Sequence, residues 1–261
     1  MRVLVVTAVA AEADSVAAGL AAARTPGPGA GPSEAPATAP VTPGAATPAP
    51  AGPSAGGNAP PPLPYRLTRH HSPAVDVLVA GVGPAAAAAG TAAALARTPY
   101  GLVVSAGIGG GFGTLAPVGS LVVAEAIVAA DLGADTPDGF VPVDELGFGR
   151  TRHLPPAALA SRAAGATGAL LAPVLTVSTV TGSAGRAALL AERHPGAGAE
   201  AMEGFGVAEA AVAHGVPVLE IRAVSNPVGP RDRAAWRIKD ALEALAHAFQ
   251  RLSPLFEEES P

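Results

Sequence analysis

A few polar side chains interrupt an otherwise apolar chain, and three groups of them could do chemistry. Glu12 follows the first apolar run, "RVLVVTAV"; Met202 and Glu203 open the segment "MEGFGVAEA"; Ser225 and Asn226 follow the run "VPVLEIRAV". A carboxylate can accept a proton or hold hydroxyl groups, whereas an asparagine amide donates and accepts hydrogen bonds without an ionisable proton. Gathered in one place, these groups could form a catalytic site.

Each group also has a purely structural interpretation. Glu12 and Glu203 could be first-turn acids, which the helix macrodipole favours. Asn226 precedes a proline, and this dipeptide often opens a turn. From spacing alone, a shared catalytic site and a set of unrelated structural residues both stay open.

Other motifs fall short of known cofactor and metal patterns. "AGIGGGFG" (106–113) is dense enough in glycine to bring backbone amides close to a ligand, but Phe112 breaks the dinucleotide fingerprint. "GVGPAA" (81–86) fits a variant of that fingerprint, but no acid follows at the distance that would hold a ribose. The aspartates of "DLGADTPDG" do not have the spacing of a calcium loop, and the histidines form no ligand pair at helical spacing. We therefore expect no cofactor and no metal.

Composition narrows the class of protein. The 261 residues are 49% hydrophobic and only 3% aromatic, with many alanines, so we expect a sizeable core with close, small-sided helix contacts. The net charge of −5 argues against a nucleic-acid partner, and the chain has no cysteine for a disulfide. The N-terminal run meets acids too early for a signal peptide or a membrane span. A cytoplasmic protein without a membrane partner is the expectation.

The order of apolar and helical segments predicts an α/β fold. Strand-like runs alternate with helical ones, which is typical of a largely parallel sheet covered on both faces. The predicted strands are 2–9, 75–80, 101–106, 120–128, 172–178 and 216–224. The predicted helices are 11–24, 84–97, 185–194, 203–214 and 231–252. In such sheets ligands bind beyond the carboxyl ends of the strands.

One segment, residues 25–64, differs from the rest. It is rich in proline, alanine and glycine and has Glu34 as its only charge. Such a segment cannot bury enough apolar surface to offset its ordering entropy. We predict a single domain over 1–261, interrupted by a disordered insertion at 25–64, either inert or a proline-motif docking site.

Five segments together resemble the nucleoside phosphorylase / methylthioadenosine nucleosidase superfamily. They are "MRVLVVTAVAAEADSV", "VLVAGVGPAAAAAGTAAAL", "VVSAGIGGGFG", "AMEGFGVA" and "VLEIRAVSNPVG", in that order, and the ending "SNPVGPRDRAAWRI" is similar to that of the futalosine hydrolase branch. The resemblance implies a central, mixed and mostly parallel sheet, partly closed and flanked by helices, usually in a homo-oligomer. It also implies a small-molecule nucleoside substrate, whose purine N-ribosidic bond is cleaved without metal or cofactor.

The resemblance assigns roles at the sugar. Glu12 matches the carboxylate that activates the attacking water, a role that a raised pKa would favour. Glu203 matches the acid that receives the ribose hydroxyls, and Met202 matches the thioether that packs on the sugar. A glycine loop matches the backbone beside the nucleophile; its residues are Gly107, Gly109 and Gly110.

The resemblance also assigns roles at the base. Adenine-releasing relatives have an aspartic acid where this chain has Asn226, and an amide suits a 6-oxopurine instead. Ser225 and the backbone near Val180 are expected beside the base, and Phe140 is the candidate stacking ring. Arg231 or Arg233 could bind a carboxylate at the end of the 5′ substituent, with Trp236 packing on the ring that carries it.

The implied activity is hydrolysis of futalosine with release of hypoxanthine, a step towards menaquinone. The first loop carries no cation for phosphate, which favours hydrolysis over phosphorolysis. The alternatives are a general purine nucleosidase or phosphorylase acting on inosine or methylthioadenosine, and a nucleoside-binding protein on the same scaffold.

Overall fold

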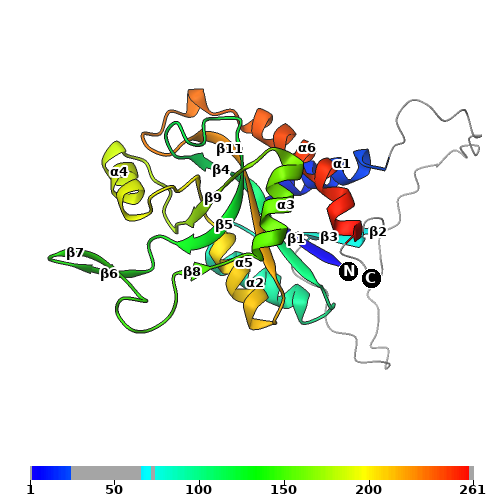
Figure 1. Ribbon diagram of the computed structural model, residues 1–261, viewed down its shortest axis with the longest axis horizontal. Coiled ribbons are helices and arrows are strands. Elements are labelled where there is room, and N and C mark those ends of the chain that lie inside the picture. The colour runs from blue at the N-terminus through cyan, green and yellow to red at the C-terminus, as the bar shows by residue number, and fades with distance from the viewer. Residues whose placement is uncertain (1, 25–65, 72–73, 259–261) are drawn as a thin grey trace, which may run out of the picture. The chain divides into compact units, whose positions relative to one another are not determined.

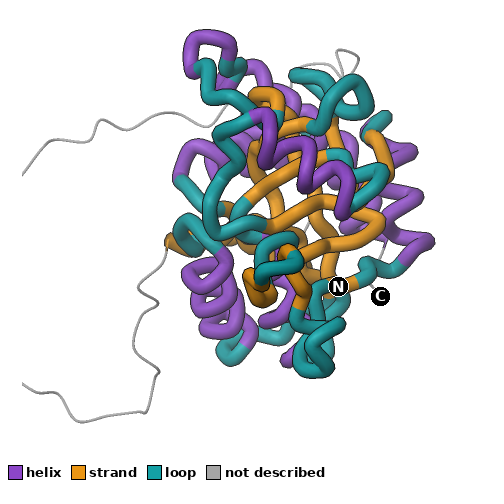
Figure 2. The backbone as a smooth tube through the Cα atoms, turned by 90° about the vertical axis from the view of Figure 1, so that its left-hand side faces the viewer, coloured by secondary structure: helices purple, strands orange, loops and turns teal. Residues whose placement is uncertain are grey.

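The structure is a computed structural model that describes residues 2–24, 66–71 and 74–258. The predicted insertion at 25–64 lies outside the described residues. The described chain folds around one large sheet with helices on both faces (Figures 1 and 2).

The large sheet has nine strands in the order β10-β9-β5-β11-β4-β1-β3-β2, with β8 paired to β5. The strands are β1 (Val3–Thr7), β2 (Arg66–His71), β3 (Ala74–Val79), β4 (Leu102–Gly111), β5 (Leu121–Ala129), β8 (Arg152–His153), β9 (Leu170–Thr176), β10 (Ala199–Ala201) and β11 (Val218–Pro227). β10 pairs parallel with β9 and antiparallel with β4, so part of the sheet closes on itself. The sheet is therefore mixed and partly closed, as the family resemblance implied.

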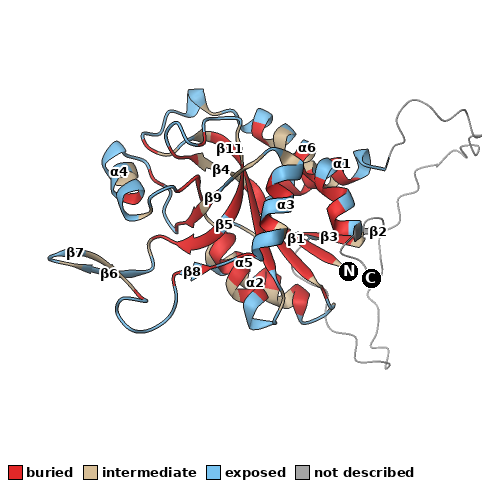
Figure 3. Ribbon diagram, viewed as in Figure 1, coloured by how far each residue is buried: buried red, intermediate tan, exposed pale blue. Residues whose placement is uncertain are grey.

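The two faces of the sheet bury two separate cores. Along β1, Val3 and Val5 face one core, and Leu4 and Val6 face the other, because strand side chains alternate. Helices α1 (Ala10–Ala22), α3 (Ala157–Thr167) and α6 (Ile238–Glu258) cover the Val3 side. Helices α2 (Pro84–Leu95) and α5 (Gly204–Ala213) cover the Leu4 side. Figure 3 shows the strands buried between these layers.

Helices pack closely through small residues, as the alanine-rich composition predicted. A Cβ added to Gly19 of α1 would lie only 2.1 Å from the carbonyl oxygen of Ala246 on α6. A Cβ added to Gly206 of α5 would lie 2.0 Å from the carbonyl oxygen of Pro84 on α2. Larger side chains at these two glycines would push the helices apart.

The six predicted strands are all present, as β1, β3, β4, β5, β9 and β11. Helix α4 (Ala184–Arg193) and three others also lie where expected. The last helix begins later than predicted, at Ile238 rather than at residue 231, because residues 231–237 contain a short 3-10 turn instead, η1 (Arg233–Ala235). Asp232 caps that turn by accepting a hydrogen bond from the Ala234 N–H at 3.1 Å.

Several elements were not predicted because their apolar patterns are weak or short. β2, "RLTRHH", is mostly polar, and β8 and β10 are very short. The hairpin β6 (Gly133–Thr136) and β7 (Gly139–Pro142) projects from the sheet, and α3 was also missed. Within the described residues, no helix combines the length and apolar character needed to cross a membrane.

Candidate active site

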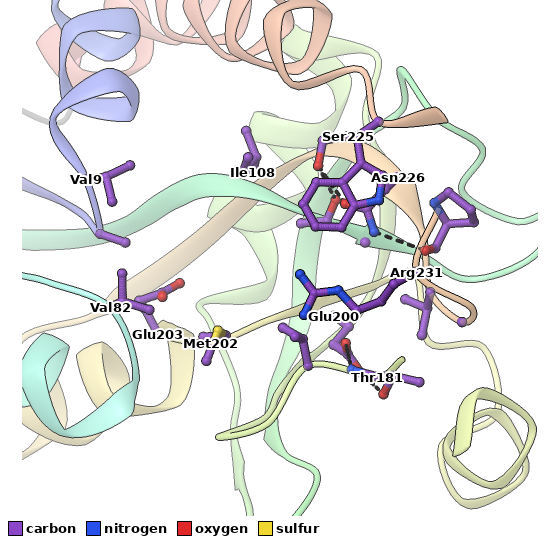
Figure 4. Close-up of a pocket in the computed structure, with 18 of the residues that line it drawn as sticks. Val9, Val82, Ile108, Thr181, Glu200, Met202, Glu203, Ser225, Asn226 and Arg231 are labelled. Carbon is purple, nitrogen blue, oxygen red and sulfur yellow. Dashed lines mark hydrogen bonds between the residues drawn. The ribbon is translucent and has the colours of Figure 1, made fainter. Parts of the chain in front are cut away.

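A pocket of about 260 Å³ lies at the carboxyl ends of β1, β4 and β11. It brings together nine of the residues that the sequence selected: Glu12, Gly109, Gly110, Val180, Met202, Glu203, Ser225, Asn226 and Arg231. Figure 4 shows Val9, Val82 and Glu203 at one end of the pocket and Asn226 with Arg231 towards the other. Residues from distant parts of the chain thus share one site.

Glu12 is held in the first turn of α1 by three backbone N–H groups. Its Oε2 accepts hydrogen bonds from Ala8 at 3.0 Å and Val9 at 3.2 Å, and its Oε1 accepts one from Ile108 at 3.0 Å. Glu12 therefore caps α1, as the structural interpretation expected, and also lines the pocket. The two roles are compatible.

The surroundings of Glu12 alter its proton affinity. Burial raises the pKa of Glu12, and the nearby charge of Glu203 adds to this effect. The Arg222 guanidinium and the backbone N–H groups oppose the rise in pKa without cancelling it. A buried carboxylate with a raised pKa is a stronger base than one in water.

Gly107 does not line the pocket but lies close to Glu12 and Arg222. A Cβ on Gly107 would stand 2.6 Å from Glu12 Oε1 and 2.7 Å from Arg222 Nη1. Both contacts are shorter than a Cβ tolerates, so the absence of a side chain allows Glu12 and Arg222 to approach β4.

Arg222 is a buried cation that the sequence analysis missed. It is 1% exposed and donates to Glu220 Oε1 at 2.9 Å, Glu203 Oε2 at 3.2 Å and Ser105 Oγ at 3.0 Å. Burial raises the pKa of Glu220, and the Arg222 guanidinium opposes this rise. Two charges of opposite sign inside the apolar run "VLEIRAV" were a signal for this network.

Glu203 occupies the N-cap position of α5, but its side chain does not cap that helix. Instead, Oε1 accepts a hydrogen bond from the Gly83 N–H at 3.2 Å, and Oε2 contacts Arg222. Glu203 therefore lies between the "GVGP" loop and the buried arginine, on the wall of the pocket next to Met202.

The amide of Asn226 is oriented by its neighbours. Ser225 Oγ lies 2.8 Å from Asn226 Oδ1, and Asn226 Nδ2 donates to the Pro227 carbonyl at 3.0 Å. Ser225 Oγ also lies 3.2 Å from the Gly109 carbonyl on β4. One N–H of the amide remains for a ligand in the pocket.

Two further polar residues of the pocket were not predicted. Glu200, on β10, accepts hydrogen bonds from the Thr181 backbone N–H at 2.8 Å and from Thr181 Oγ1 at 2.5 Å. Thr181 follows Val180, so this contact fixes the loop expected beside the base. No local sequence signal joins two residues nineteen positions apart.

Some of the aromatic and cationic residues expected at the site line the pocket, and others lie outside it. Trp236 lines the pocket, and the Arg231 guanidinium lies 5.4 Å from the centre of its ring. Arg233 contacts Trp236 at 5.8 Å but does not line the pocket. Phe140 lies on β7, where Arg193 packs over its ring at 4.5 Å. The structure thus brings Trp236, and not Phe140, to the pocket of its own chain.

Arg231 lies on the side of the pocket where the base was expected. Its Cγ and Cδ would each be 3.5 Å from a Cβ on Gly182, which follows Thr181. In the view of Figure 4 it lies between Asn226 and Glu200, with Val9 and Val82 at the other end. This position does not support its predicted contact with a 5′ carboxylate, which stays a prediction.

The site holds acids without forming a metal centre. Among the described residues, no group of three or more His, Cys, Asp or Glu side chains is arranged to hold a metal ion. The carboxylates of the pocket contact backbone N–H groups, Arg222 and Thr181 instead.

Comparison with known proteins agrees with the fold. The Phosphorylase superfamily matches residues 60–258, so the chain belongs to that superfamily. Within it, the chain is a member of the futalosine hydrolase family. The futalosine hydrolase of Streptomyces coelicolor is 68% identical over an alignment of 201 residues, and the match covers 75% of this chain and 86% of that protein. The one from Acidothermus cellulolyticus is 46% identical over 95% of this chain and 89% of its own length.

Solved structures show the same fold at low sequence identity. The native structure of futalosine hydrolase of Helicobacter pylori matches with a TM-score of 0.68 and 15% identity, over 100% of this chain and 98% of that one. The MTA/SAH nucleosidase of Streptococcus pneumoniae, in complex with 8-aminoadenine, matches with a TM-score of 0.70 and 17% identity, over 98% and 99%. The nucleoside phosphorylase-like fold expected from the sequence is confirmed.

Proposed function

We propose that this protein is an N-glycosidase that hydrolyses the N-ribosidic bond of futalosine and releases hypoxanthine. The observation that carries the proposal is that Glu12 and Asn226 line one pocket in a chain whose relatives are futalosine hydrolases. Breaking this bond builds positive charge on the sugar and negative charge on the departing base. The carboxylates at the sugar end of the pocket suit the positive charge, and the Asn226 amide at the base end suits the negative charge.

At the sugar, Glu12 accepts the proton of the attacking water. The backbone N–H groups of Ala8, Val9 and Ile108 hold its carboxylate in place, and burial raises its pKa. Glu203, fixed by Arg222 and the Gly83 N–H, receives the ribose hydroxyls. Met202 packs against the sugar as a soft apolar contact.

At the base, Asn226 supports departure of a 6-oxopurine. The free N–H of its amide donates to the 6-oxo group, and its carbonyl oxygen accepts from a protonated N7. An adenine ring presents an amino donor at the 6-position, which leaves the amide N–H without an acceptor. A mismatch between buried polar groups costs about 1–3 kcal/mol.

The charges of the pocket favour water over phosphate as the nucleophile. Among the described residues that line it, three are carboxylates, Glu12, Glu200 and Glu203, and one is a cation, Arg231. The buried Arg222 is already paired with Glu203 and Glu220. A phosphate dianion at the sugar end would meet net negative charge.

The test is the dependence of cleavage on phosphate. The protein is incubated with futalosine, inosine or methylthioadenosine in phosphate-free buffer and in buffer with added phosphate, and the free base is followed by chromatography. We expect hypoxanthine from futalosine at the same rate in both buffers. Release that requires phosphate would assign a phosphorylase, and faster release of adenine would assign an adenine-type nucleosidase.

The proposal also covers the location of the enzyme, its oligomeric state and its pathway. We propose that it acts in the cytoplasm, as a homo-oligomer, in a step that leads to menaquinone. Phe148 and Leu154, which are 64% and 70% exposed, are apolar side chains that such an assembly could cover. Sedimentation at several protein concentrations measures the oligomeric state, and a monomer at all of them would refute this part.

A further inference from the structure

Glu220 is a buried carboxylate in the apolar run of β11, outside the pocket. It is 0% exposed. Leu219 and Ile221 on either side of it face the core on the Val3 side, so Glu220 faces the other side of the sheet. Burial of a charge costs more than burial of an apolar side chain. The acid at this position therefore needs an explanation.

Glu220 is one of the groups that fix the Arg222 guanidinium. Arg222 Nε donates to Glu220 Oε1 at 2.9 Å, and Nη2 donates to the Oγ of Ser105, the residue of β4 that pairs with Glu220. A guanidinium is planar, so contacts at two of its nitrogens also set the direction of the third. The third, Nη1, donates to Glu203 Oε2 at 3.2 Å. Glu220 and Ser105 thus direct the arginine towards the acid proposed to bind the ribose.

The start of α5 packs against the Glu220 carboxylate. A Cβ on Gly204, the first residue of α5, would overlap both oxygens of Glu220. Gly204 directly follows Glu203, so the two carboxylates that contact Arg222 lie at the same helix start. Among the described residues, Glu220 Oε2 has no hydrogen-bond partner. The carboxylate is thus held by packing and by Arg222.

The Arg222 charge also lies close to Glu12, the proposed base. Arg222 Nη1 and Glu12 Oε1 are both within 2.7 Å of the point where a Cβ on Gly107 would stand. Burial raises the pKa of Glu12, and the nearby cation opposes that rise because it favours the ionised carboxylate. An anion beside the guanidinium offsets part of its field. Glu220 supplies that anion and so helps to keep Glu12 basic enough to take a proton from water.

The other charged side chains near this group are exposed or paired elsewhere. The helix α2, "PAAAAAGTAAAL", and the strand β4, "LVVSAGIGGG", carry no charged residue. On α5, Glu209 contacts His153 at 2.7 Å. Glu125 on β5 and Asp14 on α1 are exposed, as are the charged residues of α6 up to Glu257.

The charge balance around Glu12 therefore depends on three buried groups, Arg222, Glu203 and Glu220. Burial raises the pKa of Glu12 and of Glu220, the Arg222 charge opposes both rises, and the Glu203 charge adds to them. Of the three groups, Glu220 alone faces away from the pocket wall, since it lies behind Arg222 and does not line the pocket with Glu203.

We propose that Glu220 is a positioning residue for the cleavage, which holds the Arg222 guanidinium on Glu203 and balances its positive charge beside Glu12. The proposal rests on the proposed function, because it takes Glu12 as the base and Glu203 as the acid that receives the ribose hydroxyls. Glu220 does not line the pocket, so it acts through Arg222.

The alternative is that Glu220 only stabilises the fold by pairing with a buried arginine. Glu220→Gln keeps the size and an oxygen acceptor for Arg222 Nε but removes the charge. Glu220→Asp keeps the charge but shortens the side chain by one CH₂ group. Asp76→Asn is the matched control, because Asp76 is as buried as Glu220 and pairs with Arg2 at 2.7 Å, on β3 and outside the pocket.

The measurement is the pH profile of kcat/KM, with thermal unfolding of each variant as the check on stability. In Glu220→Gln the Arg222 charge acts on Glu12 without an offset, so the pKa of Glu12 falls and the acid limb moves to lower pH by about one unit. Its plateau should fall about tenfold, because a weaker base takes a proton from water less well. Glu220→Asp should keep the acid limb in place and lose about tenfold in kcat/KM, because the guanidinium is no longer held on Glu203. Asp76→Asn should keep the unmodified profile even where its Tm falls.

Three results would overturn the proposal. One is a folded Glu220→Gln variant with the unmodified acid limb, and another is an acid limb that moves equally in Asp76→Asn. The third is a Glu220→Asp variant with either a displaced limb or an unchanged kcat/KM, and this result decides the matter where Glu220→Gln does not fold.

The substrate is chosen so that this inference and the proposed function can fail separately. The profile is recorded with whichever of futalosine, inosine and methylthioadenosine the unmodified protein cleaves fastest in phosphate-free buffer. A preferred substrate other than futalosine refutes the proposed function alone. Futalosine cleavage with the same acid limb in Glu220→Gln refutes this inference alone.

Discussion

The Glu12 carboxylate accepts a hydrogen bond from the backbone N–H of Ile108 at 3.0 Å, although the two residues are 96 positions apart. This contact joins the first helix to the glycine-rich end of β4. It fixes the carboxylate at the place where the proposed water attacks the sugar. Several consequences of this geometry can be measured.

Gly107→Ala should displace the Glu12 carboxylate. The new Cβ would come within 2.6 Å of Glu12 Oε1, and an error of about 1 Å at a catalytic group can cost about 100-fold in rate. We expect a fall of that order in kcat/KM for futalosine with the fold retained, as judged by circular dichroism. Gly165→Ala is the control: on α3 its Cβ meets nothing within 4 Å, and it should stabilise the helix by about 0.5–1 kcal/mol.

The rate should decline on the acid side at a higher pH than an ordinary glutamate would cause. The ionised form of Glu12 is the one that accepts a proton, so activity is lost as the pH falls through its pKa. Burial raises that pKa, which shifts the acid limb of kcat/KM above the ordinary value of about 4.3. A limb at or below the ordinary value would contradict the role of Glu12 as the base.

Asn226→Asp should move base preference towards adenine nucleosides. A protonated carboxyl group can donate to N7 of adenine, whereas the amide suits an oxo group. We expect the ratio of kcat/KM for inosine over methylthioadenosine to fall at least about tenfold. Asn226→Leu, which has similar size and no polar atoms, should slow both substrates without reversing the preference. An unchanged ratio in Asn226→Asp would count against the assignment.

Arg231→Ala tests whether this side chain contacts the base side of the substrate or its 5′ carboxylate. Because Arg231 lies beside Gly182 and Trp236, we expect futalosine and inosine to lose kcat/KM by similar factors, about tenfold. A loss confined to futalosine would instead assign Arg231 to the 5′ carboxylate. Arg233→Ala, which alters a residue outside the pocket, should leave both rates nearly unchanged.

Much of the fold could be predicted because its strands are long and apolar. The runs that became β1, β4 and β11 are buried along most of their length, so hydrophobic pattern alone marks them. β2 lacks such a pattern, and β10 has only three residues. Their positions depend on pairing with distant strands, which no local pattern reports.

The site could be predicted only in part for the same physical reason. Glu12, Glu203 and Asn226 were selected because they are polar groups at the ends of apolar runs, and their roles came from the family resemblance. Arg222 and Glu200 act through contacts with residues far along the chain or on neighbouring strands. Phe140 was chosen as an aromatic ring by type alone, and it lies outside the pocket of its own chain.

The most direct test compares the unmodified protein with Glu12→Gln for hypoxanthine release from futalosine in phosphate-free buffer. Glutamine cannot take the proton of water, so we expect a rate at least about 100-fold lower. Asp14→Asn, on the same helix with an exposed side chain, should retain the full rate. A Glu12→Gln variant that releases hypoxanthine as fast as the unmodified protein would contradict the central claim.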